Sequence, residues 1–286
     1  MTADTVKLQL SPLLVQRAVT AALDEDLGLA GDITTDPIIA AEARGEAEIV
    51  ARQAGIIAGL DLAATSFKTL DEMAEFTGLV ADGTKVEEGT PIARIKGKTR
   101  ALLSAERVAL NFLGHLSGIA SLTATYVAAV KGTKARIICT RKTTPGLRAF
   151  EKYAVRAGGG VNHRFGLYDA VLVKDNHIAA AGGLAPALER LRARTGHLVK
   201  IEVEVDTLAQ LEEALRFSVD AVLLDNMDVA TLKQAVALVD GRVLTEASGG
   251  VTLETVREIA GSGVDLISVG ALTHSALRLD LALDWR

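Results

Sequence analysis

The alternation of strand and helix is clearest in Val199-Lys-Ile-Glu-Val-Glu-Val-Asp206 and in the later segment Asp220-Ala-Val-Leu-Leu-Asp-Asn226. Both are short apolar runs that end in polar residues. Between them, Thr207-Leu-Ala-Gln210 has the form of a capping box, which predicts a helix that begins there and continues through Arg216. Strands that alternate with amphipathic helices are typical of a parallel sheet with helices packed against it. This part of the chain therefore predicts an α/β fold.

The same pattern recurs along the second half of the chain. Further strands are predicted at Ala135–Thr140, Asp169–Val173, Arg242–Glu246 and Asp265–Val269, which makes six in all. Two more helices are expected to begin at capping residues, Asp228 for the stretch to Val239 and Thr252 for the stretch to Ala260. Because a full (β/α) barrel needs eight strands, we expect a parallel sheet that is closed or nearly closed.

Polar residues and glycines follow every predicted strand. They are Arg141, Lys142, Lys174, Glu204, Asp225, Glu246, Ser248, Gly249 and Gly270. Reactive side chains of parallel α/β proteins lie at the carboxyl ends of the strands, where loops and helix N-termini meet. A set of such residues on all six strands predicts one shared pocket. Asp206 and Asp228 fit helix capping or ion pairing better than a place in that pocket.

The residues from Arg141 to Lys174 form a basic window in an acidic protein. They include seven Lys and Arg residues and two acids, whereas the rest of the chain has 24 basic and 34 acidic residues. Arginine forks match carboxylate and phosphate geometry, lysine is a compact charge, and glycine lets backbone N–H groups approach an anion. The window therefore indicates a small ligand with several negative charges. The alternative is a solvated helix face paired with acids elsewhere.

Composition limits the classes of function. The chain has 286 residues, of which 49% are hydrophobic and 3% aromatic, and its net charge of −5 argues against broad nucleic-acid binding. Cys139 is the only cysteine, and we expect a buried, unreactive thiol in a reducing compartment. The start of the chain lacks a signal-peptide pattern, and no apolar run approaches the roughly 18 residues of a membrane span. We expect a cytoplasmic protein without a membrane segment.

The first part of the chain has a different pattern. Glu46–Gly59 is strand-like and ends in glycine turns, and Asp82–Gly97 predicts short strands joined by tight turns. The spacing of the second segment occurs in lipoyl- and biotinyl-carrier domains, but their exposed hairpin lysine is missing, so we interpret it as a structural β-element. Ser104–Val130 predicts a long helical pair with Arg107 and His115 on one face. A histidine on a helix face is expected to be structural.

Ordered motifs throughout the chain resemble one known family. They are Asp24-Glu-Asp-Leu-Gly28, Gly31-Asp-Ile-Thr-Thr35, Ser104-Ala-Glu-Arg-Val-Ala-Leu-Asn-Phe-Leu-Gly-His-Leu-Ser-Gly-Ile-Ala120, Thr140-Arg-Lys-Thr-Thr-Pro-Gly-Leu-Arg148, Lys152-Tyr-Ala-Val-Arg-Ala-Gly-Gly-Gly-Val-Asn-His-Arg164, Lys174-Asp-Asn-His177, Glu202-Val-Glu-Val-Asp206, Leu224-Asp-Asn226, Glu246-Ala-Ser-Gly-Gly250 and Val269-Gly-Ala-Leu-Thr-His274. In order and spacing they resemble quinolinate phosphoribosyltransferase, the carboxylating nicotinate-nucleotide pyrophosphorylase of de novo NAD synthesis.

The resemblance implies a fold, an assembly and a reaction. It implies an N-terminal α/β-sandwich domain, residues 1–115 joined by the C-terminal segment 275–286. Residues 116–274 would form an open, irregular parallel α/β barrel of six or seven strands. It also implies a homodimer in which Arg107 completes the partner's site. The reaction joins quinolinate to phosphoribosyl pyrophosphate (PRPP) with Mg²⁺ and releases nicotinate mononucleotide, pyrophosphate and CO₂.

The resemblance also implies roles for the candidate residues. Quinolinate, a pyridine with two adjacent carboxylates, would be bound by Arg107, Arg141, His163, Arg164 and Lys174. PRPP would be bound by Lys142, Ser248, Gly249, Gly250, Gly270 and His274. The catalytic residues would be Lys142, Lys174, Glu204 and Asp225. Glu204 and Asp225 would bind Mg²⁺, which takes one or two protein carboxylates and shares substrate oxygens. No direct role follows for Glu246 or Asp175.

Three other functions stay open at this point. A paralogue associated with molybdate operons would transfer phosphoribosyl to another acceptor, although the set Arg141, His163, Arg164 and Lys174 suits a diacid. A non-catalytic sensor or carrier of an anionic metabolite would need neither Glu204 nor Asp225. A Schiff-base aldolase would use Lys174, although Asp175 and the many cations suit anion binding better.

Overall fold

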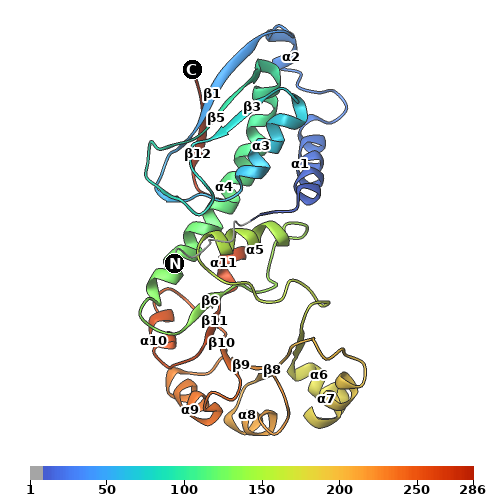
Figure 1. The fold of residues 1–286 in the computed structure, drawn as a ribbon, viewed down its shortest axis with the longest axis vertical. Helices are drawn as coiled ribbons and strands as arrows, with labels where there is room; N and C mark the ends of the chain where they lie inside the picture. Colours follow the sequence, from blue (N-terminus) through green and yellow to red (C-terminus); the bar gives the residue numbers. More distant parts are fainter. Residues whose placement is uncertain (1–8) are drawn as a thin grey trace, which may run out of the picture. The chain divides into compact units, whose positions relative to one another are not determined.

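The computed structural model describes residues 9–286, which form two compact units (Figure 1). The first unit takes the chain up to Ala124 together with Ala149–Gly159 and Ser275–Arg286. The second takes Thr125–Arg148 and Gly160–His274. The main sheet of the first unit is antiparallel, and the sheet of the second is parallel. The mixed α/β class is confirmed.

The first unit is built around a four-stranded sheet in the order β12-β1-β5-β3. Its elements are α1 (Pro12–Leu27), α2 (Thr35–Ile38), β1 (Arg44–Ala51), β2 (Gly55–Ile56), α3 (Leu60–Leu70), β3 (Glu75–Gly78), β4 (Lys85–Val86), β5 (Pro91–Lys98), most of α4 (Thr99–Ala129), α5 (Arg148–Ala157) and β12 (Leu281–Trp285). Fully buried side chains from the sheet, such as Ile49 and Ile95, share one core with Phe67 of α3 and Leu102 of α4. The sheet is therefore covered by helices on its apolar face.

The segment from Asp82 to Gly97 is structural, as predicted. It provides β4, which pairs with β2, and most of β5, which pairs with β1 and β3. Asp82 accepts hydrogen bonds from the backbone N–H of Gly59 and from the Tyr153 hydroxyl, at 2.9 and 2.5 Å. Burial raises the pKa of Asp82, although these hydrogen bonds act in the opposite direction. The segment serves packing and hydrogen bonding within its own unit.

The long helix α4 takes the place of the predicted helical pair. It is one continuous helix of 31 residues. A Cβ at Gly118 would lie 2.0 Å from the carbonyl oxygen of Leu277, and one at Gly114 would lie 2.9 Å from that of Leu279. These glycines admit the close approach of the C-terminal segment and do not mark a turn. The prediction of two helices was wrong for this reason.

Helix α4 also contains a long stretch without charged side chains. Residues 112–130 include no Asp, Glu, Lys or Arg, and by length and composition alone α4 could cross a membrane. Half of its most apolar window is buried within the chain, and the core helix of a folded protein passes the same test. The finding is weak evidence for a membrane span, but the expectation that no such run exists was wrong.

The second unit contains a parallel sheet of six strands in the order β6-β11-β10-β9-β8-β7. Its elements are β6 (Arg136–Ile138), β7 (Val171–Val173), α6 (Asp175–Ala181), α7 (Leu184–Arg192), β8 (Ile201–Val205), α8 (Leu208–Ala214), β9 (Ala221–Asp225), α9 (Val229–Val239), β10 (Leu244–Ser248), α10 (Val256–Ala260), β11 (Leu266–Ser268) and α11 (Ala271–His274). Each predicted strand is present. Within residues 9–286, no strand pairing joins β6 to β7, so the sheet is open.

An isolated parallel bridge between Ile138 and Val161 extends the open sheet at its β6 edge. Two helix caps of this unit are confirmed, because Thr207 accepts a hydrogen bond from the N–H of Gln210 and Asp228 from that of Thr231. The Thr252 cap was wrong. Residues 253–255 form a turn, and α10 begins only at Val256.

Candidate active site

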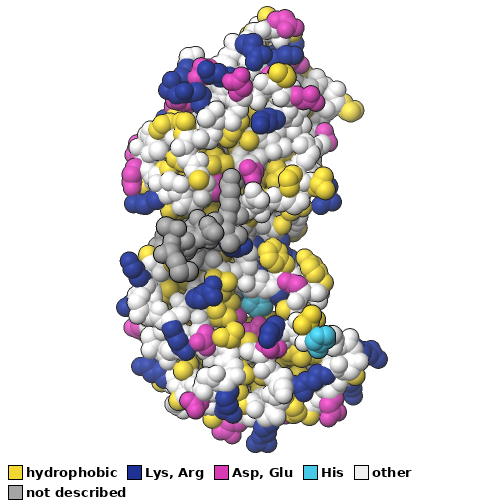
Figure 2. Space-filling view, in the orientation of Figure 1, with side chains coloured by type: hydrophobic (Ala, Val, Ile, Leu, Met, Phe, Trp, Pro, Cys, Tyr) yellow, Lys and Arg dark blue, Asp and Glu magenta, His cyan; other side chains and the backbone are white. Residues whose placement is uncertain are grey.

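A cavity of about 750 Å³ lies at the carboxyl ends of the parallel strands. Its wall includes all the predicted strand-end residues, and His163, Arg164, Gly250 and His274 line it as well. In the space-filling view this unit is hollowed, with a histidine and acidic side chains inside the hollow and Lys and Arg side chains around it (Figure 2). The parallel topology gathers these residues because every strand ends at the same edge of the sheet.

Two arginines give the cavity its basic wall. The Nε atoms of Arg141 and Arg164 are buried and have no hydrogen-bond partner among residues 9–286. Arg164 donates through one terminal nitrogen to the carbonyl of Ala170 at 2.9 Å. Burial, and then the charge of Arg141, lower the pKa of Arg164. Since a buried donor without a partner is costly, the two guanidinium groups form a site that an anion would complete.

The loops that carry these arginines are tied together. Asp169 accepts hydrogen bonds from the backbone N–H groups of Phe165 and Gly166, at 2.7 and 2.8 Å. Arg148 donates to Thr143 Oγ1 at 2.9 Å and to the carbonyl of Phe165 at 3.1 Å. Arg148 thus links the loop after β6 to the loop before β7. This link positions the basic wall before any ligand arrives.

Lys174 stands at the start of α6, directly after β7. Its Nζ atom lies 2.7 Å from Oε2 of Glu204, and its side chain is 46% exposed. The backbone N–H of Lys174 donates to Nδ1 of His177 at 3.0 Å. A lysine paired with a carboxylate at the edge of the cavity suits the binding of an anionic ligand.

A turn at the ends of β9 and β10 brings backbone groups to the cavity. Asn226 has a φ of 53°, and its N–H donates to the carbonyl of Ser248 at 3.0 Å. Its side-chain amide donates to Oδ2 of Asp225 at 2.7 Å. Gly249 has a φ of 93°, and a Cβ there would lie 2.1 Å from Oδ1 of Asn226. Only glycine fits this position, and the positive φ turns backbone N–H groups toward an anion.

The end of β11 meets the loop after β6. The hydroxyl of Thr273 donates to the carbonyl of Lys142 at 2.6 Å. A Cβ at Gly270 would lie 3.1 Å from Cδ of Lys142 and 3.3 Å from Nε2 of His274. Gly270 therefore lets the Lys142 and His274 side chains approach each other at the edge of the cavity.

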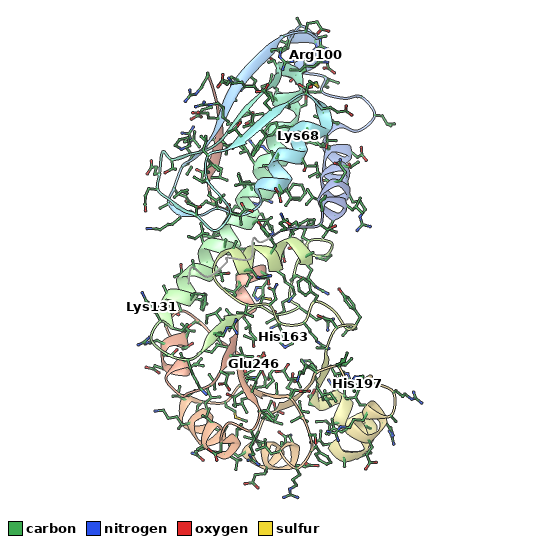
Figure 3. The ribbon with its side chains drawn as sticks, viewed as in Figure 1. Lys68, Arg100, Lys131, His163, His197 and Glu246 are labelled. Atoms are coloured by element: carbon green, nitrogen blue, oxygen red, sulfur yellow. The ribbon has the colours of Figure 1, made fainter. Side chains whose placement is uncertain are left out.

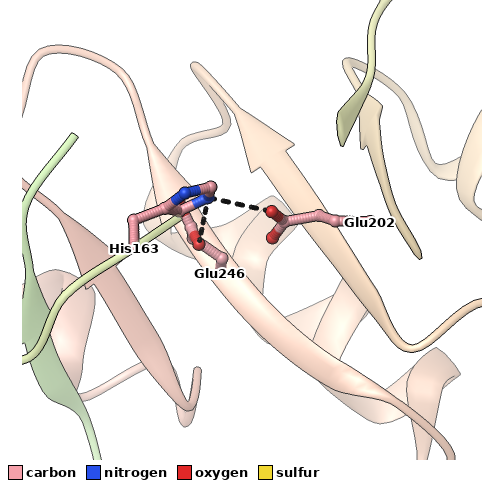
Figure 4. Close-up of side chains that lie close together, drawn as sticks. All are labelled: His163, Glu202 and Glu246. Atoms are coloured by element: carbon pink, nitrogen blue, oxygen red, sulfur yellow. Dashed lines mark hydrogen bonds and ion pairs between the residues drawn. The ribbon is translucent and has the colours of Figure 1, made fainter. Parts of the chain in front are cut away.

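His163, Glu202 and Glu246 form a cluster in the same unit, and Glu246 is its most buried member (Figure 4). Figure 3 labels His163 and Glu246 within the whole chain. Nε2 of His163 lies 3.0 Å from Oε2 of Glu202 and 3.7 Å from Oε2 of Glu246. Nδ1 of His163 accepts the backbone N–H of Arg164 at 2.7 Å. This contact assigns the proton to Nε2, the atom that donates to Glu202. Burial, and then the neighbouring Glu202, raise the pKa of Glu246 well above its ordinary value.

Glu202 was not among the predicted site residues, although a signal for it exists. Glu202 and Glu204 stand two residues apart on β8, so their side chains share one face of the sheet. The same spacing places Glu246 on the face of Ser248. A strand with acids at both positions of one face and apolar residues on the other indicates a polar interior on the acidic side.

The carboxylates of Glu204 and Asp225 fit a hard cation such as Mg²⁺. They stand at the ends of the neighbouring strands β8 and β9 and line the same cavity. One oxygen of Glu204 is engaged by Lys174, and one oxygen of Asp225 accepts from Asn226. Two protein carboxylates are what Mg²⁺ takes when substrate oxygens and water complete its coordination.

Three other residues singled out in the sequence lie outside this cavity. His115 is structural, as expected, since its Nε2 lies 2.9 Å from Oε1 of the fully buried Glu151. Cys139 is buried, as expected, and its Sγ donates to Oδ1 of Asn162 at 3.5 Å. Arg107 is exposed on α4 in the first unit and makes no hydrogen bond or ion pair with the residues that the structure describes.

Comparison with known proteins assigns the family. Residues 32–117 match the N-terminal domain of quinolinate phosphoribosyl transferase, and residues 119–284 match its C-terminal domain. The chain belongs to the quinolinate phosphoribosyltransferase family. The order of its motifs therefore reflects common descent with this family over nearly all of its length.

Individual members of the quinolinate phosphoribosyltransferase family are similar along the whole chain. A probable nicotinate-nucleotide pyrophosphorylase (carboxylating) of Bacillus subtilis (strain 168) is 46% identical, over 91% of this chain and 89% of its own. The nicotinate-nucleotide pyrophosphorylase (carboxylating) of Mycobacterium leprae is 47% identical, over 93% and 95%. The crystal structure of NadC from Streptococcus pyogenes has a TM-score of 0.93 at 42% identity, over 97% of this chain and 99% of its own.

Proposed function

We propose that this chain transfers phosphoribosyl from PRPP to quinolinate and releases nicotinate mononucleotide, pyrophosphate and CO₂. The observation that carries this proposal is the pair of buried Nε atoms of Arg141 and Arg164 in the large cavity at the strand ends. A diacid gives each guanidinium a carboxylate partner. The names of the curated relatives support the same reaction.

The quinolinate carboxylates are proposed to lie against Arg141, Arg164 and Lys174. Charge-assisted hydrogen bonds of this kind are about twice as strong as neutral ones, and the arginine fork matches a carboxylate. His163 belongs to the same wall, but both of its ring nitrogens have partners within the chain. We therefore propose that His163 orients the neighbouring side chains and contacts quinolinate through its ring. It does not act as a cation toward the carboxylates.

PRPP is proposed to bind at the turns that follow β6, β10 and β11. Lys142 and His274 supply polar side chains, and Ser248, Gly249, Gly250 and Gly270 supply a hydroxyl and accessible backbone. The positive φ of Gly249 and Gly250, 93° and 56°, favours the backbone N–H arrangement that receives phosphate oxygens.

The proposed reaction depends on the positioning of the two substrates and needs no covalent intermediate with the protein. The pyridine nitrogen attacks C1 of the ribose as pyrophosphate leaves, and positive charge develops at C1. The carboxylates of Asp225 and Glu204 are proposed to stabilise this charge. When bound between these carboxylates and the substrate, Mg²⁺ would neutralise the charge of the leaving pyrophosphate. Lys142 and Lys174 hold the anions, and the buried wall excludes water.

The direct test is incubation with quinolinate, PRPP and Mg²⁺, scored for nicotinate mononucleotide and CO₂. Nicotinate in place of quinolinate is the matched acceptor, since it lacks one carboxylate. Turnover with quinolinate as the acceptor, and none with nicotinate, supports the proposal. Turnover of another acceptor in preference would favour the molybdate-operon paralogue, and PRPP binding without turnover would favour a sensor or carrier.

We further propose a homodimer in which Arg107 completes the partner's site, and a cytoplasmic location. The exposed Arg107 guanidinium has no partner among residues 9–286, which is consistent with a role toward a second copy. Arg107→Ala and Arg141→Ala subunits should each be inactive alone. Mixed one to one, half of the dimers carry one intact site of two, so activity should recover to about a quarter of wild type. No recovery, with subunit exchange demonstrated by mass spectrometry, would place Arg107 in its own chain's site or in none.

A further inference from the structure

The proposed reaction requires a proton that none of the roles above supplies. When CO₂ leaves C2 of the pyridinium ring, the electron pair of the broken bond stays on C2. We propose that Glu246 delivers the proton to C2, with Glu202 and His163 as its positioning residues. This inference rests on the proposed function, and it assigns a residue to the second half of that reaction.

Glu246 lies where the acid must be. It stands on β10 two residues before Ser248, so it lies about 7 Å deeper along the strand than the turn proposed to bind phosphate. Its residue surface is only 2% exposed, yet its side chain lines the cavity together with Arg141 and Arg164. A pyridine whose carboxylates contact those arginines would therefore bring its ring to the level of Glu246.

The surroundings of Glu246 favour the protonated form of its carboxyl group. The groups that face it are the carboxylates of Glu202 and Glu204, the His163 ring and the Ser268 hydroxyl. Nε2–H of His163 donates to Glu202, which belongs to the same cluster as Glu246. Burial, and then the neighbouring Glu202 carboxylate, raise the pKa of Glu246. An ionised Glu246 would also repel a dianionic ligand, so binding of a diacid favours the same neutral form.

A second cavity offers a route by which the proton is replaced. It has a volume of about 180 Å³ and is lined by His163, Glu202 and Glu246. Its other wall includes Lys200 and Asp220, at the amino ends of β8 and β9. The Lys200 side chain is 78% exposed, so this end meets solvent. Glu246 lines both cavities and can take up a proton from one side after giving it up on the other.

The proposed step balances in atoms and charge. The bond between C2 and its carboxylate carbon breaks, CO₂ leaves, and the pair on C2 is stabilised by the adjacent pyridinium nitrogen. The O–H bond of Glu246 breaks and a C2–H bond forms, which leaves Glu246 as a carboxylate. A proton taken up from solvent through the second cavity then restores the acid, so the net reaction consumes one solvent proton. Without a nearby donor, the pair on C2 recaptures CO₂ before solvent reaches it.

Rapid-quench kinetics of a single turnover tests this role, because pyrophosphate reports phosphoribosyl transfer and CO₂ reports decarboxylation. In Glu246→Gln, pyrophosphate release should stay within about twofold of wild type, while CO₂ release slows about 100-fold, the usual contribution of a general acid. Quinolinate mononucleotide should accumulate. Glu246→Asp keeps an acid and should recover part of the CO₂ rate. Glu212→Gln, at an exposed position of α8, is the matched control and should leave both rates unchanged.

Other outcomes would overturn the inference. Equal slowing of pyrophosphate and CO₂ in both Glu246 variants, with wild-type thermal unfolding, would mean that Glu246 serves binding. Wild-type rates for both products in Glu246→Gln would mean that it has no role in the step. A wild-type chain that releases no pyrophosphate would reject the proposed function, and the inference with it.

Discussion

The main sheet of each unit contains a buried glutamate, Glu48 in the first and Glu246 in the second, and the two have opposite surroundings. Glu48 on β1 accepts hydrogen bonds from Arg94 at 2.8 Å and from Arg286 at 2.6 Å, and these arginines lower its pKa. Glu246 on β10 faces another carboxylate, Glu202, and its pKa is raised. Both residues are buried, at 7% and 2% exposure.

Burial in a strand therefore does not by itself determine the role of a glutamate or the direction of its pKa shift. At Glu48 the antiparallel neighbours bring cations, and the result is an ion pair that belongs to the fold. At Glu246 the parallel neighbours bring an acid, and the result is a carboxyl group with a raised pKa in the wall of a cavity. Perturbed carboxyl groups of the second kind are the ones that concentrate at functional sites.

The largest expected effect is a loss of activity when an arginine of the cavity is removed, compared with a loss of stability when an arginine of the first sheet is removed. Arg141→Ala and Arg164→Ala should each lower kcat/KM for quinolinate about 100-fold, since a charge-assisted contact is worth roughly 1.5–3 kcal/mol. Arg94→Ala, which removes the partner of Glu48, should lower the thermal midpoint and leave KM for quinolinate unchanged. Steady-state kinetics and thermal unfolding of the three variants check this. Near-normal quinolinate kinetics in both cavity variants would remove the basis for the diacid assignment.

The next effect concerns the two carboxylates at the ends of β8 and β9. Asp225→Ala and Glu204→Ala should raise KM for PRPP at least about tenfold and change quinolinate binding less, because hard carboxylates are proposed to share a cation with PRPP oxygens. Titration with Mg²⁺ and with excess chelator is the measurement. Full turnover in chelator would reject the metal. Glu48→Ala is the control, since that carboxylate serves an ion pair and should leave the metal requirement unchanged.

A smaller effect appears in the pH dependence of stability. The pKa of Glu48 is lowered, so its contribution is present above about pH 4.5 and is lost as pH falls through the folded pKa; Glu48→Gln should be destabilised at pH 7. The pKa of Glu246 is raised, so its contribution is lost as pH rises. Glu246→Gln should therefore gain about 3 °C in thermal midpoint between pH 5 and pH 8 relative to wild type. The same sign of change in both variants would contradict the comparison.

The smallest effect is expected at Asp32, in the first unit. Hydrogen bonds from Thr35, with further ones from Ser104 and Thr34, lower its pKa from 3.8 to about 2. Asp32→Asn should cost about 1 kcal/mol at pH 7 after allowance for solvent screening. The loss should vanish as pH falls through about 2. Urea unfolding at several pH values measures it. A change in quinolinate KM would show that Asp32 is more than a structural acid.

Much of the site could be predicted, because strand ends are a local feature. The apolar runs that became β8 and β9 are visible in the chain, and Glu204 and Asp225 follow from where those runs end. The continuity of α4 could not be predicted, since Gly114 and Gly118 look like helix breakers until Leu277 and Leu279 are known to pack against them. Glu202 was not predicted as a site residue, although its spacing of two residues from Glu204 places both side chains on the same face of β8.

The sequence by itself determined the alternation of strands and helices, the family, and the set of cations and carboxylates at the strand ends. These depend on residues close together in the chain, or on motifs whose order is conserved by descent. The direction in which the pKa of each buried acid shifts depends on the tertiary structure. Glu48 and Glu246 both lie inside strands, and the residues of their own strands do not reveal which charges will face them. Their pKa values depend on side chains from other strands, Arg94 beside one and Glu202 beside the other, because charge interactions act through space at short range.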